Sequence, residues 1–349
     1  MARILYGING VGLGHAIRSS VVLDYLSKEH EIFILTSNRA YSHLNKYYDN
    51  THNIEGVELV FKKNEIVNMP TIFRNVRKVS KKNIDKFNFI KRKIDKFKPQ
   101  IVISDVEFFS GWYSRKNNIP LISIDNQHYL IFGDYKFPSK YSWQHSKTKM
   151  IIELLTKKAN YYLITTFLKN KIKEKDNIFC SPPLIRDSVL NAKPSNGDYI
   201  FVYQSTKSYE KLFSILKSVN EKFIIYGFDR TSQEGNLTFK RFNEDKEFID
   251  DLSNSKAVIS NGGFTLISEA LYLKKPILVI PIKKHFEQVI NGLYVKQWNH
   301  GEMYDDLTFD RIRSFINKLK EYKKYTTPQK DNKALFKKLD QIIKKECKA

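Results

Sequence analysis

A glycine-rich turn that ends in a histidine is the first part of the sequence whose residue types suit chemistry. The turn, Gly10-Val11-Gly12-Leu13-Gly14-His15, lies between a predicted buried strand at 3–8 and a predicted helix from 17 to 26. Its glycines permit positive φ and a close approach of the backbone to a ligand, and a helix N-terminus favours an anion. An imidazole can take a proton from a hydroxyl group near neutral pH. His15 is therefore a candidate general base, and the alternative is a capping or packing histidine.

The spacing of these glycines does not match a dinucleotide-binding turn. That fingerprint needs the pattern GxGxxG and an acidic residue after the second strand. Here the third glycine comes one residue early, and the second predicted strand, at 31–37, is followed by Asn38 and Arg39. The pattern disfavours NAD, while Arg39 leaves NADP open.

A second glycine turn follows a predicted strand in the C-terminal half. It reads Ser260-Asn261-Gly262-Gly263-Phe264-Thr265, and Thr265 is predicted to cap the next helix. Backbone N–H groups at the positive end of a helix suit a diphosphate. Glu269, one turn further, could accept two hydrogen bonds from a ribose diol, or it could simply complement the helix dipole.

A third motif follows the next predicted strand, at 276–282. Glu287 and Gln288 are predicted to begin a helix there and could bind the hydroxyl groups of a polyol. Because consecutive parallel strands end at one edge of a sheet, we expect this motif beside the second one. The alternative is an ordinary solvated start of a helix.

The elements that must position these motifs alternate between short apolar runs and helical stretches. This alternation predicts an α/β fold of two Rossmann-like, doubly wound parallel-sheet domains that face each other and bind ligands between them. Further strands are predicted at 100–105, 120–125, 161–166, 177–182, 199–204, 222–227 and 257–263. The predicted parts are an N-terminal domain at 1–182, a linker and hinge at 183–197, a C-terminal domain at 198–325 and a closing helix at 326–349.

The 349-residue chain carries a formal net charge of +22, from 59 Lys and Arg against 37 Asp and Glu. Such a charge favours polyanions, although a Lys-rich composition alone could produce it. Residues 62–98 hold thirteen basic residues against three acidic ones, with apolar residues at helical spacing. We predict one or two basic amphipathic helices there that could lie on an anionic membrane. The alternative is a surface helix whose apolar face packs on the core.

The rest of the composition excludes several classes of protein. The only two cysteines, Cys180 and Cys347, and the absence of a Cys/His cluster argue against a disulfide scaffold and a zinc site. No apolar run approaches the ~18 residues that a membrane-spanning helix needs. The N-terminus lacks the features of a signal peptide. We therefore expect a cytoplasmic protein, with peripheral attachment to the inner face of the membrane if 62–98 binds lipid.

Taken together, the motifs resemble those of GT-B glycosyltransferases of the inverting, nucleotide-sugar-dependent type. The first turn resembles their acceptor-side loop, and SNGGFTLISEALYLKKPILVIPIKKHFEQVINGLYV at 260–295 resembles their donor signature. The likeness is to a little-characterised archaeal and bacterial branch akin to the MurG and diacylglycerol glucosyltransferase groups. It implies transfer of a hexosyl or N-acetylhexosaminyl group from a nucleoside-diphosphate sugar, expected to be UDP-linked, to a hydroxyl acceptor.

The resemblance also implies roles for individual residues. His15 would be the general base, oriented by Asp105, with Asp125 and His128 as rivals for that role. The diphosphate, ribose, sugar and base would contact Gln204, Ser205, Thr206, Phe242, Asn261, Gly262, Gly263, Phe264, Thr265, Glu269, Glu287 and Gln288. Many relatives have His where Asn261 stands, so Lys207 or Arg186 would supply the missing positive charge.

The mechanism that we expect is a single displacement with inversion, in which the nucleotide sugar is a substrate and neither a cofactor nor a metal is needed. The acceptor could be lipid-linked or a cell-envelope glycan such as a teichoic acid, bound through 62–98. Three alternatives remain: a non-hydrolysing sugar-nucleotide epimerase of the same fold, a basic nucleic-acid-binding protein, and, last, an NADP oxidoreductase. No nucleic-acid-binding motif appears, so we expect no nucleic acid partner.

Overall fold

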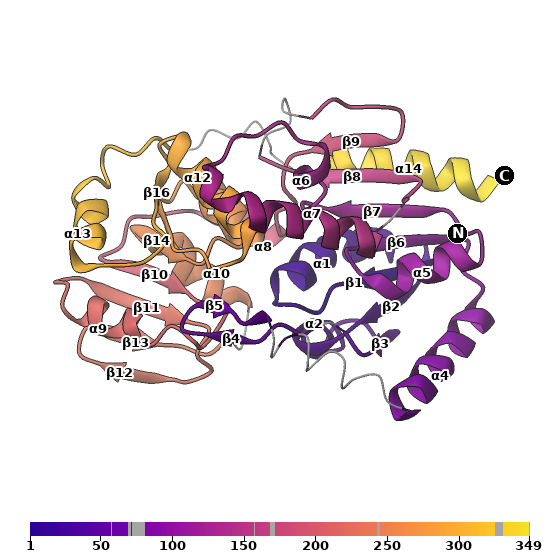
Figure 1. Ribbon diagram of the computed structural model, residues 1–349, viewed down its shortest axis with the longest axis horizontal. Coiled ribbons are helices and arrows are strands. Elements are labelled where there is room, and N and C mark those ends of the chain that lie inside the picture. The colour runs from indigo at the N-terminus through magenta and orange to yellow at the C-terminus, as the bar shows by residue number, and fades with distance from the viewer. Residues whose placement is uncertain are drawn as a thin grey trace. The chain divides into compact units, whose positions relative to one another are not determined.

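The chain folds into two compact units. The computed structural model describes residues 1–56, 58–68, 71, 81–156, 158–167, 172–242, 245–324 and 331–348 (Figure 1). Unit 1 contains Met1–Leu59, Asn68–Leu184 and Asp331–Ala349, and unit 2 contains Val60–Val67 and Ile185–Lys330.

Unit 1 is built on a seven-stranded sheet in the order β3-β2-β1-β6-β7-β8-β9, in which every pair of neighbours is parallel. Its strands are β1 (Arg3–Ile8), β2 (Glu31–Thr36), β3 (Thr51–Asn53), β6 (Ile101–Asp105), β7 (Leu121–Asp125), β8 (Tyr161–Thr165) and β9 (Ile178–Ser181). The central strand β1 lies between β2 and β6, so the chain crosses over beside it. Such a crossover is where open parallel sheets place ligands, outside the carboxyl ends of the strands.

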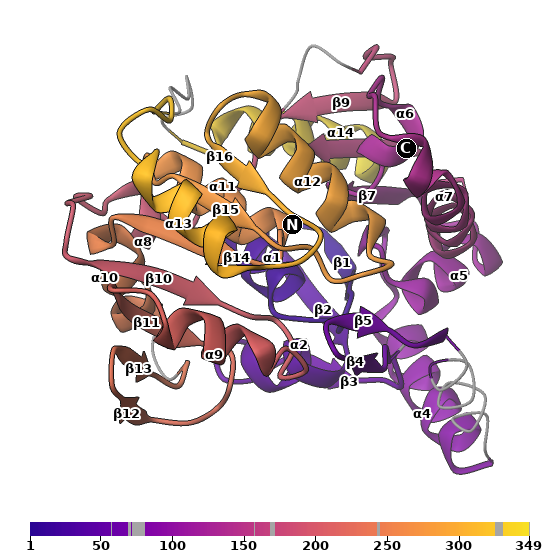
Figure 2. The same ribbon diagram turned by 60° about the vertical axis from the view of Figure 1, so that its left-hand side comes forward.

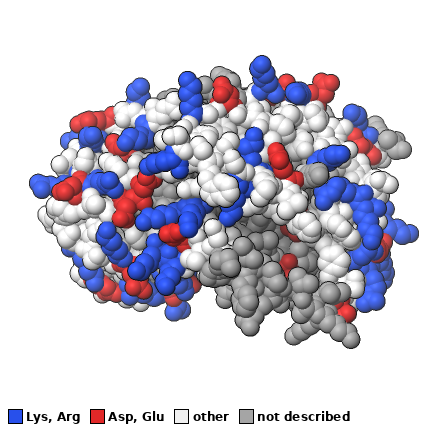
Figure 3. Space-filling view, viewed as in Figure 1, with Lys and Arg blue, Asp and Glu red and all other residues white. Residues whose placement is uncertain are grey.

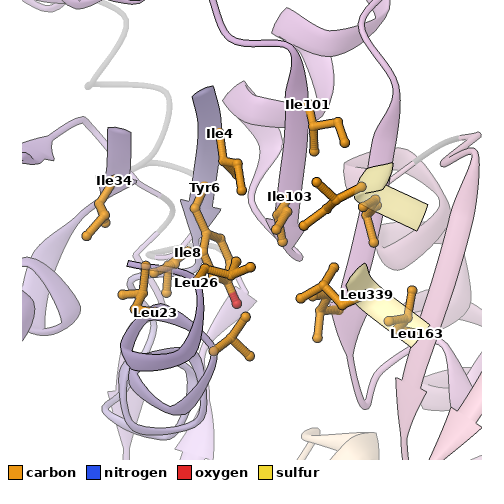
Figure 4. Close-up of a cluster of buried hydrophobic side chains, with 14 of the residues drawn as sticks. Ile4, Tyr6, Ile8, Leu23, Leu26, Ile34, Ile101, Ile103, Leu163 and Leu339 are labelled. Atoms are coloured by element: carbon orange, nitrogen blue, oxygen red, sulfur yellow. The ribbon is translucent and has the colours of Figure 1, made fainter. Parts of the chain in front are cut away.

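Helices cover both faces of this sheet. They are α1 (Gly14–Leu26), α2 (Asn38–Leu44), α4 (Lys81–Phe97), α5 (Phe108–Lys116), α6 (Tyr129–Phe132), α7 (Ser142–Thr156) and α14 (Lys333–Lys348), with a 3-10 turn at Ser139–Tyr141. Ile4, Tyr6 and Ile8 of β1 pack with α1 and α14 in one hydrophobic cluster (Figure 4), whereas Leu5 packs with α4 and α5 in another. This alternation follows from the two-residue period of a strand.

Unit 2 is built on a second seven-stranded sheet, in the order β12-β13-β11-β10-β14-β15-β16. Its strands are β10 (Tyr199–Tyr203), β11 (Lys222–Tyr226), β12 (Ser232–Glu234), β13 (Leu237–Phe239), β14 (Ala257–Ser260), β15 (Ile277–Val279) and β16 (Gly301–Met303). Only β12 is antiparallel to its neighbour. The helices are α8 (Asp187–Leu190), α9 (Lys211–Lys217), α10 (Asp245–Asn254), α11 (Phe264–Tyr272), α12 (Phe286–Gln297) and α13 (Phe309–Asn317).

The boundaries of the units differ from the predicted ones in three places. A short hairpin of β4 (Phe61–Lys62) and β5 (Glu65–Ile66) belongs to unit 2, although the chain on either side of it belongs to unit 1. The closing helix α14 packs on unit 1, where it lies along the sheet in both ribbon views (Figures 1 and 2). Residues 185–197 of the predicted linker at 183–197 belong to unit 2 and contain α8, and the Lys275 ammonium donates to the Ser195 carbonyl.

The predicted basic helix at 62–98 is partly wrong. Its first residues form β4 and β5 rather than a helix, α4 confirms its last part, and residues 69–70 and 72–80 lie outside the described residues. Ile90 and Ile94 of α4 are buried in the core of unit 1, so this apolar face is not available to a membrane. Arg92, Lys93 and Lys96 of α4 are exposed, and Figure 3 shows Lys and Arg gathered at the right-hand edge, where Figure 1 has α4 and α5. Among the described helices, none is both long and apolar enough to span a bilayer.

Candidate functional site

His15 and Asp105 come together at the carboxyl ends of the central strands of unit 1. His15 is the second residue of α1, and Asp105 is the last residue of β6, paired in register with Ile8 at the end of β1. His15 Nδ1 lies 2.9 Å from Asp105 Oδ1. The imidazole is 15% exposed and the carboxylate only 1%. Water or a ligand can therefore reach the ring, while the group that orients it is buried.

Arg18, one turn after His15 on α1, fixes this arrangement. Its Nε donates to Asp105 Oδ2 at 2.8 Å, its Nη2 donates to Asp105 Oδ1 and, at 3.0 Å, to Gln127 Oε1, and its Nη1 donates to Asn126 Oδ1. The guanidinium has no lone pair to offer, although Nη2 also lies 2.8 Å from His15 Nδ1. Because these Arg18 donors have acceptors of their own, we infer that His15 Nδ1 carries a proton and donates it to Asp105. In that tautomer His15 Nε2 is free to accept a proton.

The electrostatics of Asp105 support this assignment. Burial alone would raise the pKa of Asp105, but the Arg18 guanidinium and the His15 ring outweigh burial and hold the pKa well below its usual range. Ser19 Oγ donates a further hydrogen bond to Asp105 Oδ2 at 3.2 Å. Asp105 therefore stays ionised at neutral pH as an acceptor for His15.

The rival pair, Asp125 and His128, forms a separate and internally satisfied group. His128 Nδ1 lies 2.7 Å from Asp125 Oδ2, and His128 Nε2 lies 3.0 Å from Thr156 Oγ1. Both residues are buried, and Ser123 Oγ also donates to Asp125 at 2.6 Å. Neighbours thus engage both nitrogens of His128, which indicates a structural role for the pair.

The glycine turn beside His15 depends on close backbone approaches. A Cβ on Gly10 would lie 2.1 Å from Ser37 Oγ and 2.5 Å from the Ser37 carbonyl oxygen, so only glycine fits. Gly12 has a φ of +80° with nothing within 4 Å of an added Cβ, and Gly14 begins α1. Asn9 closes the turn by donating to the Val106 carbonyl at 2.9 Å. An open backbone surface at Gly12 is consistent with a ligand near the turn.

In unit 2, Asn261 joins the turns that follow β10 and β14. Its Oδ1 accepts from the Ser205 N–H at 2.8 Å and from the Ser205 hydroxyl at 3.2 Å, and its Nδ2 donates to Gln204 Oε1 at 2.8 Å. Gln204 is fully buried, and its Nε2 has no hydrogen-bond partner within the described ranges. Thr206, also buried, lies 2.9 Å from Ser208 through the two hydroxyl oxygens. The two predicted phosphate-side loops are therefore neighbours.

The glycine turn after β14 differs from its prediction in one detail. The N-cap of α11 is Gly263, and the helix begins at Phe264, so Thr265 lies in the first turn and is not the cap. Gly262 has a φ of +92°, and its carbonyl accepts a hydrogen bond from Asn291 Nδ2 at 2.9 Å. Gly263 itself has no side chain that could cap α11, which suits an anion site at this helix N-terminus.

Glu269 is engaged by a buried arginine. Arg186 Nε donates to Glu269 Oε1 at 2.7 Å, and Nη2 donates to Oε2 at 2.8 Å. Arg186 Nη1 lies 3.2 Å from Asp245 Oδ2, and the guanidinium lies 5.9 Å from the centre of the Phe248 ring. Phe242 contacts Phe248 edge to face, with ring centres 5.1 Å apart. The predicted base and ribose residues thus lie around one aromatic and charged cluster, in which each Glu269 oxygen keeps lone pairs for a ligand.

The predicted sugar-binding pair begins α12. Gln288 is buried, and its Oε1 accepts from the Ile282 N–H at 2.9 Å, whereas Glu287 is half-buried in the first turn.

Lys207, one of the two residues predicted to supply positive charge at the phosphate site, is exposed and pairs with Asp229 at 2.8 Å. Arg186, the other, is bound to Glu269 and Asp245. Across the described residues no cluster of three or more His, Cys, Asp or Glu could hold a metal ion.

Sequence reasoning missed four polar residues of these networks. They are Arg18, Asn126 and Gln127 around Asp105, and Asn64, whose Oδ1 lies 3.4 Å from Asn261 Nδ2. Arg18 had a signal, because a residue three after His15 on a helix lies on the same face. The others are distant in sequence from the groups that they contact.

Comparisons with known proteins identify relatives of this chain. A family model described as glycosyl transferase family 1 matches residues 2–320. Over 102 residues the chain is 31% identical to UDP-N-acetylglucosamine–N-acetylmuramyl-(pentapeptide) pyrophosphoryl-undecaprenol N-acetylglucosamine transferase 3 of Bacillus cereus, a match that covers 28% of this chain and 27% of that protein. It is 24% identical over 252 residues to an uncharacterised glycosyltransferase of Methanosarcina mazei, covering 64% and 65%. The chain thus matches less than two thirds of the length of these curated relatives.

Solved structures share the fold at low identity. Arabidopsis thaliana UGT89C1 complexed with UDP-L-rhamnose is 14% identical, with a TM-score of 0.62 and 99% of each chain covered. Phytolacca americana UGT2 complexed with UDP-2-fluoro-glucose and pterostilbene is 13% identical, with a TM-score of 0.61 and 91% and 90% covered. The predicted fold class is confirmed: both units are Rossmann-like, as in GT-B glycosyltransferases.

Proposed function

Because the family model spans residues 2–320, the chain belongs to glycosyl transferase family 1, and on this premise we propose that it transfers a sugar from a UDP-sugar to a hydroxyl acceptor with inversion. The observation that carries the proposal is the His15–Asp105 pair, in which a buried carboxylate lies 2.9 Å from Nδ1 of a partly exposed imidazole. A base oriented in this way is what attack by a hydroxyl group requires.

The donor half of the proposal rests on unit 2. The glycine cap of α11, the Ser205 amide and the buried Asn261 lie together at the carboxyl ends of β10 and β14, where N–H groups can bind the diphosphate. Glu269 would accept the ribose hydroxyls, Phe242 would pack near the base, and Glu287 and Gln288 would bind the sugar. UDP is proposed as the nucleotide because the names of both the Bacillus cereus relative and the plant structures contain UDP-linked sugars.

The chemical step is a single displacement. The acceptor oxygen forms a bond to the anomeric carbon as the bond from that carbon to the diphosphate oxygen breaks, and the acceptor proton moves to His15 Nε2. Attack opposite the leaving group inverts the anomeric centre. The leaving diphosphate gains negative charge, which the α11 N-terminus and nearby N–H groups would stabilise, so the proposal calls on no metal ion.

The experiment that tests this function combines ligand binding with transfer. Thermal unfolding is measured with UDP, GDP, UDP-sugars, NADPH and a short DNA duplex, and a ligand at 100 times its dissociation constant adds about 2.7 kcal/mol to the free energy of unfolding. We expect UDP and one UDP-sugar to stabilise the protein. His15→Ala should keep that stabilisation and lose about a hundredfold or more of the transfer rate to glycolipid acceptors. Stabilisation by NADPH or DNA alone would refute the proposal.

For the acceptor we propose a lipid-linked hydroxyl presented at the cytoplasmic face of an anionic membrane. Two surfaces of unit 1 support this, namely the basic side chains of Lys91, Arg92 and Lys93 on α4 and an apolar stripe on α7. Trp143, Met150 and Leu154 are 79%, 63% and 65% exposed, and their spacing of seven and four residues places them on one side of the helix. Aromatic and apolar side chains beside lysines are typical of surfaces that enter a bilayer interface.

Vesicle sedimentation tests the membrane proposal. With vesicles containing anionic lipid, the parent should pellet, and both Lys91→Glu/Arg92→Glu/Lys93→Glu and Trp143→Ser/Leu154→Ser should stay in the supernatant. The matched control changes three exposed lysines of unit 2, at 211, 217 and 222, to glutamate and should pellet as the parent does. If the control pellets as poorly as the α4 variant, net charge alone explains the binding to anionic vesicles. If all four proteins pellet equally, neither surface of unit 1 binds the membrane.

A further inference from the structure

The hairpin of β4 and β5 ends in a turn that requires positive φ at both central residues. Lys63 and Asn64 have φ values of +48° and +57°, between the paired residues Lys62 and Glu65. This is the conformation of a two-residue type I′ turn, and asparagine is among the few residues that adopt it readily. The turn therefore presents Asn64 at the tip of the hairpin, while Lys63 is exposed to solvent.

The backbone of the hairpin pairs with the segment that leads from β15 into α12. The Lys283 N–H donates to the Asn64 carbonyl at 2.8 Å, and the Ile66 N–H donates to the Lys283 carbonyl at 3.1 Å. Lys284 Nζ adds an ion pair to Glu65 at 2.6 Å. The hairpin thus acts as an extra strand that fixes the segment immediately before Glu287 and Gln288.

The Asn64 side chain reaches the centre of the phosphate-side turns. Its Nδ2 donates to the Pro281 carbonyl at 3.3 Å, its Oδ1 lies 3.4 Å from Asn261 Nδ2, and its backbone N–H donates to Ser208 Oγ at 3.2 Å. Asn64 is only 2% exposed. One residue therefore contacts the segments that follow β10, β14 and β15, all at the carboxyl edge of the sheet of unit 2.

We propose that Asn64 is a positioning residue for the diphosphate of the nucleotide donor. This inference rests on the proposed function, because it assumes that a diphosphate binds at these turns. Asn261 has two amide protons and three acceptors within reach, namely Gln204 Oε1, the Ile280 carbonyl and Asn64 Oδ1. Asn64 is the most distant of them in sequence, 197 residues from Asn261, and it also holds the segment before α12. Without the Asn64 side chain, the turns after β10, β14 and β15 would populate other arrangements. The apparent affinity for the diphosphate then falls in proportion to the fraction of molecules whose turns can bind it.

The nucleoside should not depend on Asn64. The proposed ribose residue, Glu269, is held by Arg186, and the proposed base residue, Phe242, packs against Phe248. A positioning role at the diphosphate therefore predicts a loss of affinity for UDP without a loss for uridine. Damage to unit 2 as a whole would weaken both ligands.

The experiment measures dissociation constants of UDP and uridine for the full chain and three variants. Asn64→Gly keeps the left-handed turn and removes the side chain, and we expect the Kd for UDP to rise about tenfold with the Kd for uridine unchanged. Asn64→Asp keeps the shape but adds a negative charge, so UDP should bind more weakly still, and more so at low salt. Lys63→Gly, at the exposed position of the same turn, is the matched control and should bind both ligands as the parent does.

The outcomes separate the two proposals. If the parent binds UDP and Asn64→Gly binds it equally well, the positioning role is wrong and the proposed function stands. The same conclusion holds if UDP and uridine lose affinity by one common factor. If the parent binds no nucleoside diphosphate, the proposed function fails and Asn64 has no such role. Should Asn64→Gly fold poorly, Asn64→Asp decides, because it must weaken UDP more than uridine.

Discussion

Replacing Glu269 by glutamine separates its observed contact with Arg186 from its proposed contact with ribose. The ion pair is bidentate, with distances of 2.7 and 2.8 Å, and Glu269 and Arg186 are 1% and 8% exposed. Removal of one partner from a buried ion pair costs about 3–5 kcal/mol. Because glutamine keeps one acceptor, we expect Glu269→Gln to lower the free energy of unfolding by about 3 kcal/mol. A hydrogen bond from a hydroxyl to a carboxylate contributes about 1.5–3 kcal/mol.

The assay compares binding of UDP and 2′-deoxy-UDP by titration calorimetry. If Glu269 accepts a hydrogen bond from the 2′-hydroxyl, the parent should prefer UDP by a factor of about 10–150, which is that hydrogen bond expressed as a ratio of dissociation constants. Glu269→Gln should reduce the preference to about threefold or less. Urea unfolding of the same samples reports the cost of the broken ion pair separately.

A paired variant controls for damage to the fold. Arg186→Gln/Glu269→Gln removes both charges and should recover part of the stability lost in Glu269→Gln, because no buried charge is left unpaired. Its preference for UDP should nevertheless stay low, since the carboxylate is absent. If the parent binds UDP and 2′-deoxy-UDP equally, Glu269 does not contact the ribose and serves only the ion pair.

Two further predictions concern unit 2. Gly263 has a φ of −62° and nothing within 4 Å of an added Cβ, so the free energy of unfolding of Gly263→Ala should lie within about 0.5 kcal/mol of the parent value. The same variant should bind UDP at least about tenfold more weakly in calorimetry. An unchanged affinity would place the diphosphate elsewhere. Burial lowers the pKa of Lys275 from 10.5 to about 8, so the unfolded state binds more protons between those values and the free energy of unfolding should rise with pH there. Lys275→Met should lack this rise in urea titrations at pH 7–10, and parallel curves for both proteins would contradict the assignment.

The longer strands of both sheets were predictable because they are buried on both faces. Such strands appear in the sequence as nearly continuous apolar runs, for example RILYGI at Arg3–Ile8 and KFIIY at Lys222–Tyr226. The short strands β3, β12, β13 and β16 have three residues each, too few to show a period of two. The helix predicted at 62–98 is wrong at the hairpin because it treats the basic residues as one segment, although Lys63-Asn64 suits a turn with positive φ.

The site was predictable where a turn or a strand end marks it. His15 and Asp105 lie at such ends, and their contact at 2.9 Å follows from the pairing of β1 with β6. Whether His15 is the base stays a prediction. Partners across the fold had no such signal: Arg186 precedes Glu269 by 83 residues, and Asn64 precedes Asn261 by 197. Only tertiary packing creates those pairs.

Asn261 carries no charge, but its hydrogen bonds make it compatible with a phosphate site. The Ser205 N–H, a donor that a diphosphate would use, is bound to Asn261 Oδ1 at 2.8 Å. A phosphate oxygen that takes over this N–H replaces a neutral acceptor by a charged one, and charge-assisted hydrogen bonds are about twice as strong. Asparagine can also turn its amide so that Nδ2 faces the anion, if the Gln204 amide turns with it and its Nε2, which has no partner among the described residues, donates to Asn261 Oδ1. In the observed orientation Asn64 Oδ1 lies 3.4 Å from Asn261 Nδ2, so the hairpin residue helps to hold the amide whose oxygen meets the Ser205 N–H.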